Sequence, residues 1–181
     1  MIAIIDYNSG NTASVANALR RLGQRYEITG DPELVARADK IIFPGVGAAK
    51  AAMKELKKRG LDKLLRRTKL PVLGICLGLQ LLAEFSEEDN TKCLGIIPGR
   101  VKRFSDDLKV PQIGWNRVGK DYFYFVHSYY LPVGHYTLAT ATYGVPFSAI
   151  IQKDNFYATQ FHPEKSGEAG LQILRNFCTS C

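Results

Sequence analysis

The 181-residue sequence contains no apolar run long enough to cross a lipid bilayer. Its longest apolar stretches, such as residues 71–75, are far shorter than the roughly 20 residues that a transmembrane helix needs. The first residues reach an acidic side chain, Asp6, before any basic one, and they lack the small-residue cleavage site of a signal peptide. We therefore expect a protein that stays in the cytoplasm.

Cysteine is also scarce, with 4 residues in the chain. A disulfide framework is not expected, because the 46% hydrophobic content is enough to build a sizeable core. Cys178 and Cys181 have C-x-x-C spacing, but no second pair of metal ligands stands nearby, so a helix end is the favoured interpretation. We expect one domain over residues 1–181, without a metal or a cofactor.

No block of like charge explains the net charge of +7. The basic residues are spread out, and their densest run, between residues 54 and 67, falls on helical faces that we expect to be solvated. Aromatic residues are not interleaved with this run, as a base-stacking surface would require. An acidic protein partner or an anionic metabolite therefore explains any functional share of the charge better than a nucleic acid does.

The first half of the chain alternates short apolar runs with amphipathic segments, the pattern of βαβ units around a parallel sheet. We expect strands at residues 2–6, 25–28, 40–43 and 71–75, and helices at residues 11–22, 48–58, 61–67 and 77–85.

The second half is rich in Val, Tyr and Phe punctuated by Gly and Pro, which predicts short strands. They lie at residues 100–104, 116–118, 122–126, 136–141, 148–152 and 156–159, and we expect them to be antiparallel additions to the parallel core. A helix at residues 168–177 closes the chain. The fold class is α/β with a mixed sheet.

The strongest local signal is a G-x-C-x-G pattern at residues 74–78, where a predicted strand runs directly into a helix. This is the pattern of a nucleophile elbow with Cys76 in the place of serine. The sulfur would lie at a helix N-terminus, where a thiolate is stabilised, and the backbone N–H of Leu77 could bind an oxyanion. An ordinary buried cysteine after a central strand explains the pattern about equally well.

A second motif, His162-Pro163-Glu164, supplies a possible base for that cysteine. A thiol needs a base to become a good nucleophile, and the base needs an acceptor to orient it. In a non-helical segment, Glu164 and His162 can project to the same side. Alone this motif is more typical of a surface loop, but with the elbow it favours a triad of Cys76, His162 and Glu164.

A glycine-rich turn at residues 43–47 follows the third predicted strand. In a parallel sheet this turn lies at the same edge as the elbow, so its amides could complete an oxyanion hole. An ordinary strand-to-helix turn is the alternative. A phosphate-binding P-loop is excluded, because no Gly-Lys-Ser/Thr follows.

With these motifs the chain resembles the triad (class I) glutamine amidotransferases. Further segments are similar to the glutaminase subunits of imidazole glycerol phosphate synthases, in the same order and over nearly the whole chain: residues 5–11, 44–47, 99–101, 111–116, 125–129 and 162–166. The resemblance implies a three-layer fold with a central, mixed, mostly parallel sheet, antiparallel additions, and helices on both faces.

The resemblance also implies roles for single residues. Cys76 would attack the glutamine carboxamide, and His162, held by Glu164, would move the protons. Val46 and Leu77 would form the oxyanion hole. The residues that would bind glutamine are Gly47, Gln80, Ser128 and Tyr129.

A partner is implied as well, namely a cyclase subunit with a (β/α)₈ barrel that would use the ammonia in histidine biosynthesis. The residues implied at this interface are Asn11, Trp115, Tyr129 and Lys165. Each has a simpler interpretation, such as a helix cap for Asn11, core packing for Trp115 and a solvated charge for Lys165. His127 and His135 are interpreted as ordinary polar residues.

The chain departs from the family pattern where Ala48 and Ala49 follow the glycine-rich turn and where Leu79 stands in the elbow. These departures concern the oxyanion loop and leave the triad intact. Two competing functions remain: another triad amidotransferase, such as the vitamin B6 glutaminase, and a catalytically silent scaffold subunit. The segments around Trp115 and Lys165 disfavour the first, and the intact triad disfavours the second.

Overall fold

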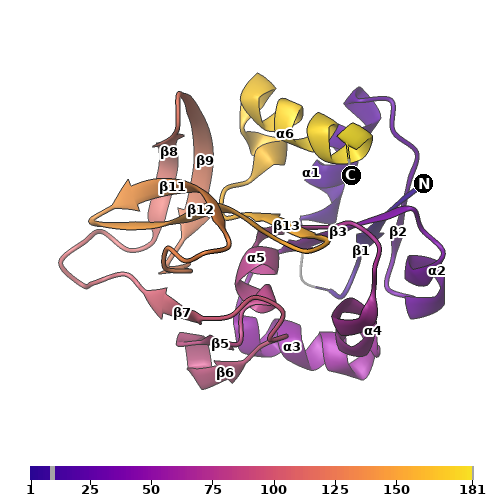
Figure 1. The fold of residues 1–181 in the computed structure, drawn as a ribbon, viewed down its shortest axis with the longest axis horizontal. Helices are drawn as coiled ribbons and strands as arrows, with labels where there is room; N and C mark the ends of the chain where they lie inside the picture. The colour runs from indigo at the N-terminus through magenta and orange to yellow at the C-terminus, as the bar shows by residue number, and fades with distance from the viewer. Residues whose placement is uncertain (9–10, 181) are drawn as a thin grey trace.

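A computed structural model of the chain describes residues 1–8 and 11–180 (Figure 1). Ser9 and Gly10, within the similarity segment at residues 5–11, lie outside the described residues, as does Cys181 of the C-x-x-C pair. Within the described part of the chain, no helix is both long and apolar enough to cross a membrane.

A seven-stranded sheet forms the centre of the molecule, in the order β11-β12-β13-β4-β3-β1-β2. Strands β2, β1, β3, β4 and β13 run parallel, and β12 and β11 extend the sheet antiparallel. The bounds are β1 (Ile2–Ile5), β2 (Tyr26–Thr29), β3 (Lys40–Gly45), β4 (Val72–Cys76), β11 (Thr137–Tyr143), β12 (Val145–Lys153) and β13 (Phe156–Thr159).

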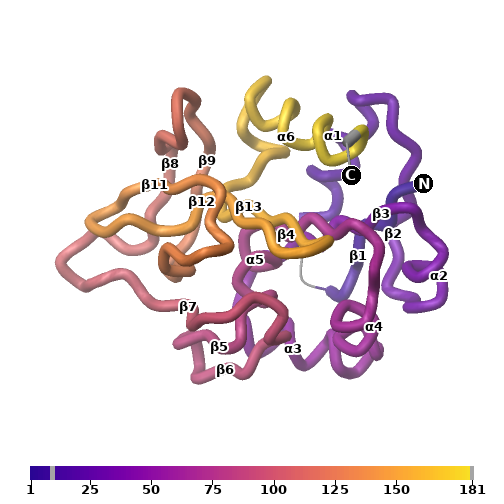
Figure 2. The backbone as a smooth tube through the Cα atoms, in the orientation of Figure 1, coloured from indigo at the N-terminus to yellow at the C-terminus, as the bar shows by residue number. Residues whose placement is uncertain are grey.

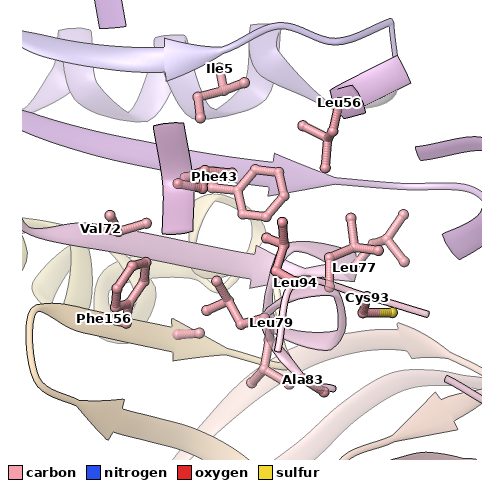
Figure 3. Close-up of a cluster of buried hydrophobic side chains, with 14 of the residues drawn as sticks. Ile5, Phe43, Leu56, Val72, Leu77, Leu79, Ala83, Cys93, Leu94 and Phe156 are labelled. Atoms are coloured by element: carbon pink, nitrogen blue, oxygen red, sulfur yellow. The ribbon is translucent and has the colours of Figure 1, made fainter. Parts of the chain in front are cut away.

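Helices cover both faces of this sheet, because successive side chains of its central strands are apolar on both sides. One face packs against α1 (Thr12–Arg21) and α6 (Gly167–Ser180). The other packs against α2 (Pro32–Ala36), α3 (Ala49–Lys58), α4 (Leu61–Arg67) and α5 (Leu77–Leu82). Figure 3 shows Phe43 of β3 among Leu56, Leu77 and Leu79 from these helices. The predicted α/β class and three-layer architecture are confirmed.

A second group of strands lies to one side of this three-layer body (Figure 1). Strands β8 (Gln112–Val118) and β9 (Asp121–His127) form a hairpin, which encloses aromatic residues with β11 and β12, among them Phe125, Phe147 and Phe161. A small sheet joins β10 (Tyr129–Tyr130), β7 (Arg100–Arg103), β5 (Phe85–Ser86) and β6 (Thr91–Lys92). Two short 3₁₀ turns, η1 (Glu88–Asn90) and η2 (Pro163–Lys165), complete the elements.

The prediction that the later strands all join the core antiparallel is wrong for four of them. β13 is a parallel strand of the core, paired with β4 in register from Phe156↔Val72 to Thr159↔Ile75. β7 lies in the small sheet, and the β8–β9 hairpin is a sheet of its own. The reason is that a local pattern fixes a strand's inward face, whereas its direction depends on partners distant in sequence.

Two helix predictions also need correction. The helix expected at residues 77–85 ends at Leu82, because Ala83 is extended (φ −63°, ψ 172°) and Phe85 pairs with Arg100 of β7. Helix α2 was not predicted, although Asp31 before Pro32 is a helix-start signal. The Asp31 carboxylate accepts a hydrogen bond from the Glu33 N–H at 2.9 Å.

The backbone path in Figure 2 ends where α6 returns beside the start of the sheet. The ammonium of Lys40 donates to the carbonyl oxygens of Phe177 and Cys178, at 2.9 and 2.6 Å. A cation is favourable at this end of a helix, where backbone carbonyls lack partners. Cys178 therefore lies within the last turns of α6, as predicted from its position.

Candidate active site

A pocket of about 280 Å³ opens where the carboxyl edge of the central sheet meets the second group of strands. The predicted catalytic Cys76 and His162 line it. So do all six predicted oxyanion-hole and substrate-binding residues, which are Val46, Gly47, Leu77, Gln80, Ser128 and Tyr129. Residues from six different parts of the chain thus converge on one space, at the carboxyl ends of parallel strands, where ligands of α/β folds commonly bind.

Cys76 occupies the turn between β4 and α5 in a strained backbone conformation, with φ 54° and ψ −107°. A non-glycine residue in such a conformation is uncommon and is found mostly at functional sites. Neighbouring segments pack so closely against this turn that Gly74 and Gly78 have no space for a side chain. A Cβ on Gly78 would lie 2.0 Å from the carbonyl oxygen of Phe43, and one on Gly74 would lie 3.0 Å from the Cβ of Ala158.

His162 follows β13 and faces the same pocket. Its backbone N–H donates to the carbonyl oxygen of Tyr124 at 2.9 Å, and its own carbonyl accepts from the Ser166 hydroxyl at 2.6 Å. The Nδ1 atom lies 2.8 Å from a carboxylate oxygen of Glu164, and both side chains are almost fully buried. Among the described residues, the buried Nε2 has no hydrogen-bond partner. Nε2 is therefore the ring atom left to exchange a proton in the pocket.

Two opposing influences set the pKa of His162. Burial, the larger single influence, lowers the pKa, but the interactions with the sulfur of Cys76 and the carboxylate of Glu164 together raise it to about 10. A histidine with this pKa is protonated at neutral pH. Cys76 therefore faces an imidazolium ion, which stabilises a thiolate.

The loop after β3 lies directly beside the nucleophile, since Gly45 pairs with Cys76 in the sheet register. The buried Tyr7 hydroxyl donates to the carbonyl oxygen of Pro44 at 2.9 Å and so holds the start of this loop. Val46 is 40% exposed, and Gly47 has a positive φ of 94°. Leu77 begins α5 directly after Cys76, so the loop after β3 and the start of α5 both line the pocket beside the nucleophile.

The predicted substrate-binding side chains come from α5, from Ser128 after β9 and from β10. Gln80 is 4% exposed, and its amide nitrogen donates to the Tyr129 carbonyl oxygen at 2.9 Å. Ser128 and Tyr129 are partly buried along the same wall.

Three polar residues of the site were not predicted as functional. The first, Glu88 of η1, lines the pocket and accepts a hydrogen bond from the Ala49 N–H at 2.7 Å. Burial raises the pKa of Glu88. Its neighbours Glu87 and Asp89 make the segment look like a solvated acidic run, so the sequence offers no local signal.

His127, the second, is a buried residue of the pocket lining. Its Nδ1 lies 2.8 Å from the Tyr129 carbonyl oxygen, and its Nε2 lies 3.0 Å from the side-chain amide of Gln112. Burial lowers the pKa of His127 to about 4, so the ring is neutral at pH 7. Both partners are oxygen atoms, so the neutral ring donates its single N–H to one of them, and the ring braces the pocket wall.

The third is Gln160, whose fully buried amide nitrogen lies 3.8 Å from the sulfur of Cys76. It stands two residues before His162, and this spacing was the only sequence signal for it.

Of the predicted partner-interface residues, Tyr129 lines the pocket, and the other three lie on separate elements. Trp115 on β8 is 58% exposed, so the core-packing interpretation is wrong. Its ring meets the ring of Tyr124 edge-to-face, with 6.2 Å between the ring centroids. Lys165 is exposed in η2, next to the triad. Asn11 is at the N-cap position of α1, but its side chain makes no capping hydrogen bond. Helix α1 and strand β9 both lie against η2, which brings these residues onto neighbouring elements.

The described residues were also considered as possible metal ligands. Across residues 1–8 and 11–180, no group of three or more His, Cys, Asp and Glu side chains is placed to hold a metal ion.

Comparison with known proteins identifies the family. The family model for glutamine amidotransferase class-I matches residues 3–181. An imidazole glycerol phosphate synthase subunit HisH from Bacteroides fragilis (strain YCH46) is 51% identical, over 97% of both chains. The HisH subunit from Vibrio cholerae is 45% identical, again over 97% of both chains.

Solved structures agree on the fold. A crystal structure of a glutamine amidotransferase aligns with a TM-score of 0.79 at 21% identity, covering 98% of this chain and 97% of that one. The pocket, the strained Cys76 and the buried His162–Glu164 pair thus stand on a glutamine amidotransferase fold. The chain belongs to the class-I glutamine amidotransferase family and, within it, to the imidazole glycerol phosphate synthase HisH subunits.

Proposed function

We propose that this chain is the glutaminase subunit of an imidazole glycerol phosphate synthase and works in the cytoplasm as one domain of residues 1–181. It hydrolyses L-glutamine to L-glutamate and ammonia and passes the ammonia to a cyclase subunit in histidine biosynthesis. The observation that carries the proposal is the buried His162 ring. Its Nδ1 is held by Glu164 at 2.8 Å, while Nε2 shares a pocket with Cys76.

In the first half of the reaction, the Cys76 thiolate attacks the side-chain carbonyl carbon of glutamine. The carbonyl electron pair moves to oxygen, where the backbone amides of Val46 and Leu77 stabilise the developing charge. His162 then gives the Nε2 proton to the amide nitrogen. The C–N bond breaks, ammonia leaves, and a γ-glutamyl thioester remains on Cys76.

Water completes the cycle. His162, now neutral, takes a proton from a water molecule as its oxygen attacks the thioester carbon. The C–S bond breaks and glutamate leaves. The thiolate and the imidazolium are restored, and the pKa of about 10 keeps the His162 ring protonated.

Glutamine itself is held by the pocket wall. Gln80, Gly47, Ser128 and Tyr129 bind its polar groups, and the carboxylate of Glu88 suits the α-ammonium group, because a partly buried carboxylate gains most from a cationic partner. The pocket volume of about 280 Å³ is appropriate for one amino acid.

The partner is a separate cyclase subunit with a (β/α)₈ barrel, which converts the ammonia and a ribonucleotide to imidazole glycerol phosphate and an aminoimidazole carboxamide ribotide. It docks on the face that carries Asn11, Trp115, Tyr129 and Lys165. The exposure of Trp115 supports this, because large aromatic side chains are typical anchors of protein interfaces. We expect the Val46 amide to turn toward the oxyanion only when the ligand-bound cyclase is in place, so the chain alone has low activity.

The test measures glutamine hydrolysis by the purified chain, with and without the cognate cyclase and its ribonucleotide, beside a Cys76→Ala variant. We expect slow hydrolysis alone, faster hydrolysis in the complex, and none in the variant. Hydrolysis that survives in Cys76→Ala would contradict the mechanism. Activity indifferent to the cyclase would contradict the partner.

A further inference from the structure

Gln160 is a fully buried polar residue that the mechanism so far leaves without a task. It lies between the end of β13 and His162, and its backbone N–H donates to the Ala149 carbonyl oxygen of β12 at 2.9 Å. A buried amide is stable only if its own donors and acceptors are satisfied. Its side-chain contacts therefore show what it does.

Both ends of the Gln160 amide meet residues of the active site. The Nε2 atom donates to the sulfur of Cys76 at 3.8 Å, and the Oε1 atom accepts from Nε2 of Gln80 at 3.3 Å. The opposite orientation of the amide is disfavoured. It would turn an oxygen toward a thiolate and an N–H toward another N–H.

The contact with Gln80 fixes how that residue faces the substrate. A glutamine side chain has two N–H donors and one carbonyl acceptor. Gln80 directs its amide nitrogen to the Tyr129 carbonyl oxygen at 2.9 Å and to Gln160. Both of its donors are therefore used, and only its oxygen remains for the pocket.

We propose that Gln160 is a further catalytic residue, which holds the Cys76 sulfur through its N–H and orients Gln80 so that Gln80 offers only an acceptor to the substrate. This inference rests on the proposed function. It predicts that Gln80 binds a nitrogen donor of glutamine, either the ammonium or the carboxamide NH₂, and does not bind the carboxylate.

The experiment compares Gln160→Met and Gln80→Met with the double variant, since methionine keeps the length of the side chain and removes the amide. The matched control is Gln152→Met, because Gln152 on β12 makes its amide hydrogen bond to the Tyr157 hydroxyl at 3.3 Å, outside the pocket lining. Cooperative thermal unfolding checks that each variant folds. If Gln160→Met does not fold, Gln160→Asn replaces it, because the shortened amide withdraws the donor from the sulfur.

The first readout needs no substrate. Alkylation of Cys76 by iodoacetamide at neutral pH, followed by peptide mass mapping, reports on the thiolate. We expect a rate about threefold to tenfold lower in Gln160→Met, because a charge-assisted hydrogen bond is lost while the freed thiolate is intrinsically more reactive. We expect no change in Gln152→Met.

The second readout is glutamine hydrolysis in the complex with the cyclase. Gln160→Met should lower kcat about tenfold and raise KM about threefold or more. In the Gln80→Met background it should still lower kcat but leave KM unchanged, because its effect on binding acts through Gln80.

An unchanged alkylation rate in Gln160→Met would overturn the role at the sulfur, and additive KM effects would overturn the role through Gln80. If the proposed function itself is wrong, the experiment gives a different result. In that case the wild-type complex would not hydrolyse glutamine, whereas the alkylation readout would still report on the contact between Gln160 and Cys76.

Discussion

His162 lies between two groups that favour its charged form, the sulfur of Cys76 and the carboxylate of Glu164. Burial opposes that charge, yet the pKa is raised to about 10. The site therefore keeps a proton on the imidazole at neutral pH, ready for the leaving ammonia. Because Glu164 supplies part of this effect, it controls both the orientation and the charge of the ring.

Replacing Glu164 by Gln tests this role. The ring loses its anionic acceptor, so we expect kcat to fall by about 10²- to 10⁴-fold with little change in KM, as when the orienting carboxylate of other triads is removed. The pKa of His162, followed by NMR titration, should fall below its wild-type value. Glu168→Gln, at an exposed carboxylate on α6, is the control and should change neither. An unchanged pKa would contradict the account.

His127 has the opposite electrostatic environment. Burial lowers its pKa to about 4, whereas a histidine in the unfolded chain titrates near 6.5. The unfolded state therefore binds this proton more readily. The stability that neutral His127 contributes is fully present above pH ~6.5 and is lost as the pH falls toward 4.

We expect the free energy of unfolding to decrease across this interval by up to about 3 kcal/mol on account of His127. Urea denaturation at several pH values measures it. The dependence should be shallower in His127→Gln, which keeps an amide to bridge Tyr129 and Gln112. The control His135→Gln, at an exposed histidine, should follow the wild type. Parallel pH profiles of His127→Gln and the wild type would contradict this role.

The sequence alone was enough to locate the catalytic residues that lie in short local motifs. Cys76 was found from its flanking glycines, and His162 and Glu164 from their spacing. Glu88 and Gln160 were missed because their contacts join positions 39 and 84 residues apart, with Ala49 and Cys76. Only folding brings such pairs together, and neither residue sits in a pattern that marks it as functional.

At the scale of elements, the site depends on how closely β3, β4 and α5 approach one another. Gly78 in the first turn of α5 lies against the carbonyl oxygen of Phe43, where an added Cβ would come within 2.0 Å. Backbone cannot yield at this contact without moving the helix that begins at the nucleophile.

Gly78→Ala should therefore destabilise the fold by about 3 kcal/mol or more, within the range of an overpacked core, and abolish hydrolysis. Chemical denaturation measures the loss. Gly119→Ala is the control, because Gly119 in the β8–β9 turn has open space around it and a φ of 62°. It should cost only about 1–2 kcal/mol, from the left-handed backbone alone. Equal losses at the two glycines would contradict the close-approach argument.

The elements themselves were predictable where the pattern is local. The parallel strands β1, β3 and β4 and helices α3 and α4 follow from apolar periodicity. The direction of β13 and the separate hairpin did not, because Phe156 and Trp115 pack against partners that the pattern does not name. The end of α5 at Leu82 was missed because the following residues pair with β7 instead of continuing an apolar helix.

At the scale of the molecule, the pocket lies at the junction of two cores. One core supplies Cys76 from the central sheet, and the aromatic core around Phe125 and Phe161 supports His127 at the end of β9 and the segment that carries His162. The β8–β9 hairpin leaves one apolar face exposed to solvent. On it, Ile113 is 64% exposed, Trp115 58% and Tyr122 59%. Exposed apolar faces of this kind are typical of docking surfaces, and we propose this one for the partner subunit.

Trp115→Ala tests that surface. Because Trp115 is mostly exposed, the free energy of unfolding should change by less than about 1 kcal/mol, whereas binding to the cyclase should weaken by about 2 kcal/mol or more. Calorimetric titration of the complex measures the latter. Leu138→Ala, at an equally exposed apolar side chain on β11, is the control and should leave binding unchanged. Unaltered affinity in Trp115→Ala would place the partner elsewhere.

The central claim is that Cys76 carries the substrate's acyl group during turnover. Its most direct test is acid quenching of the complex within the first turnover of glutamine, followed by mass spectrometry of the peptide that contains Cys76. We predict that this peptide gains the mass of one glutamine less one ammonia, and that Cys76→Ala shows neither the adduct nor ammonia release. Ammonia released in the first turnover, with Cys76 unmodified at every quench time, would contradict the account.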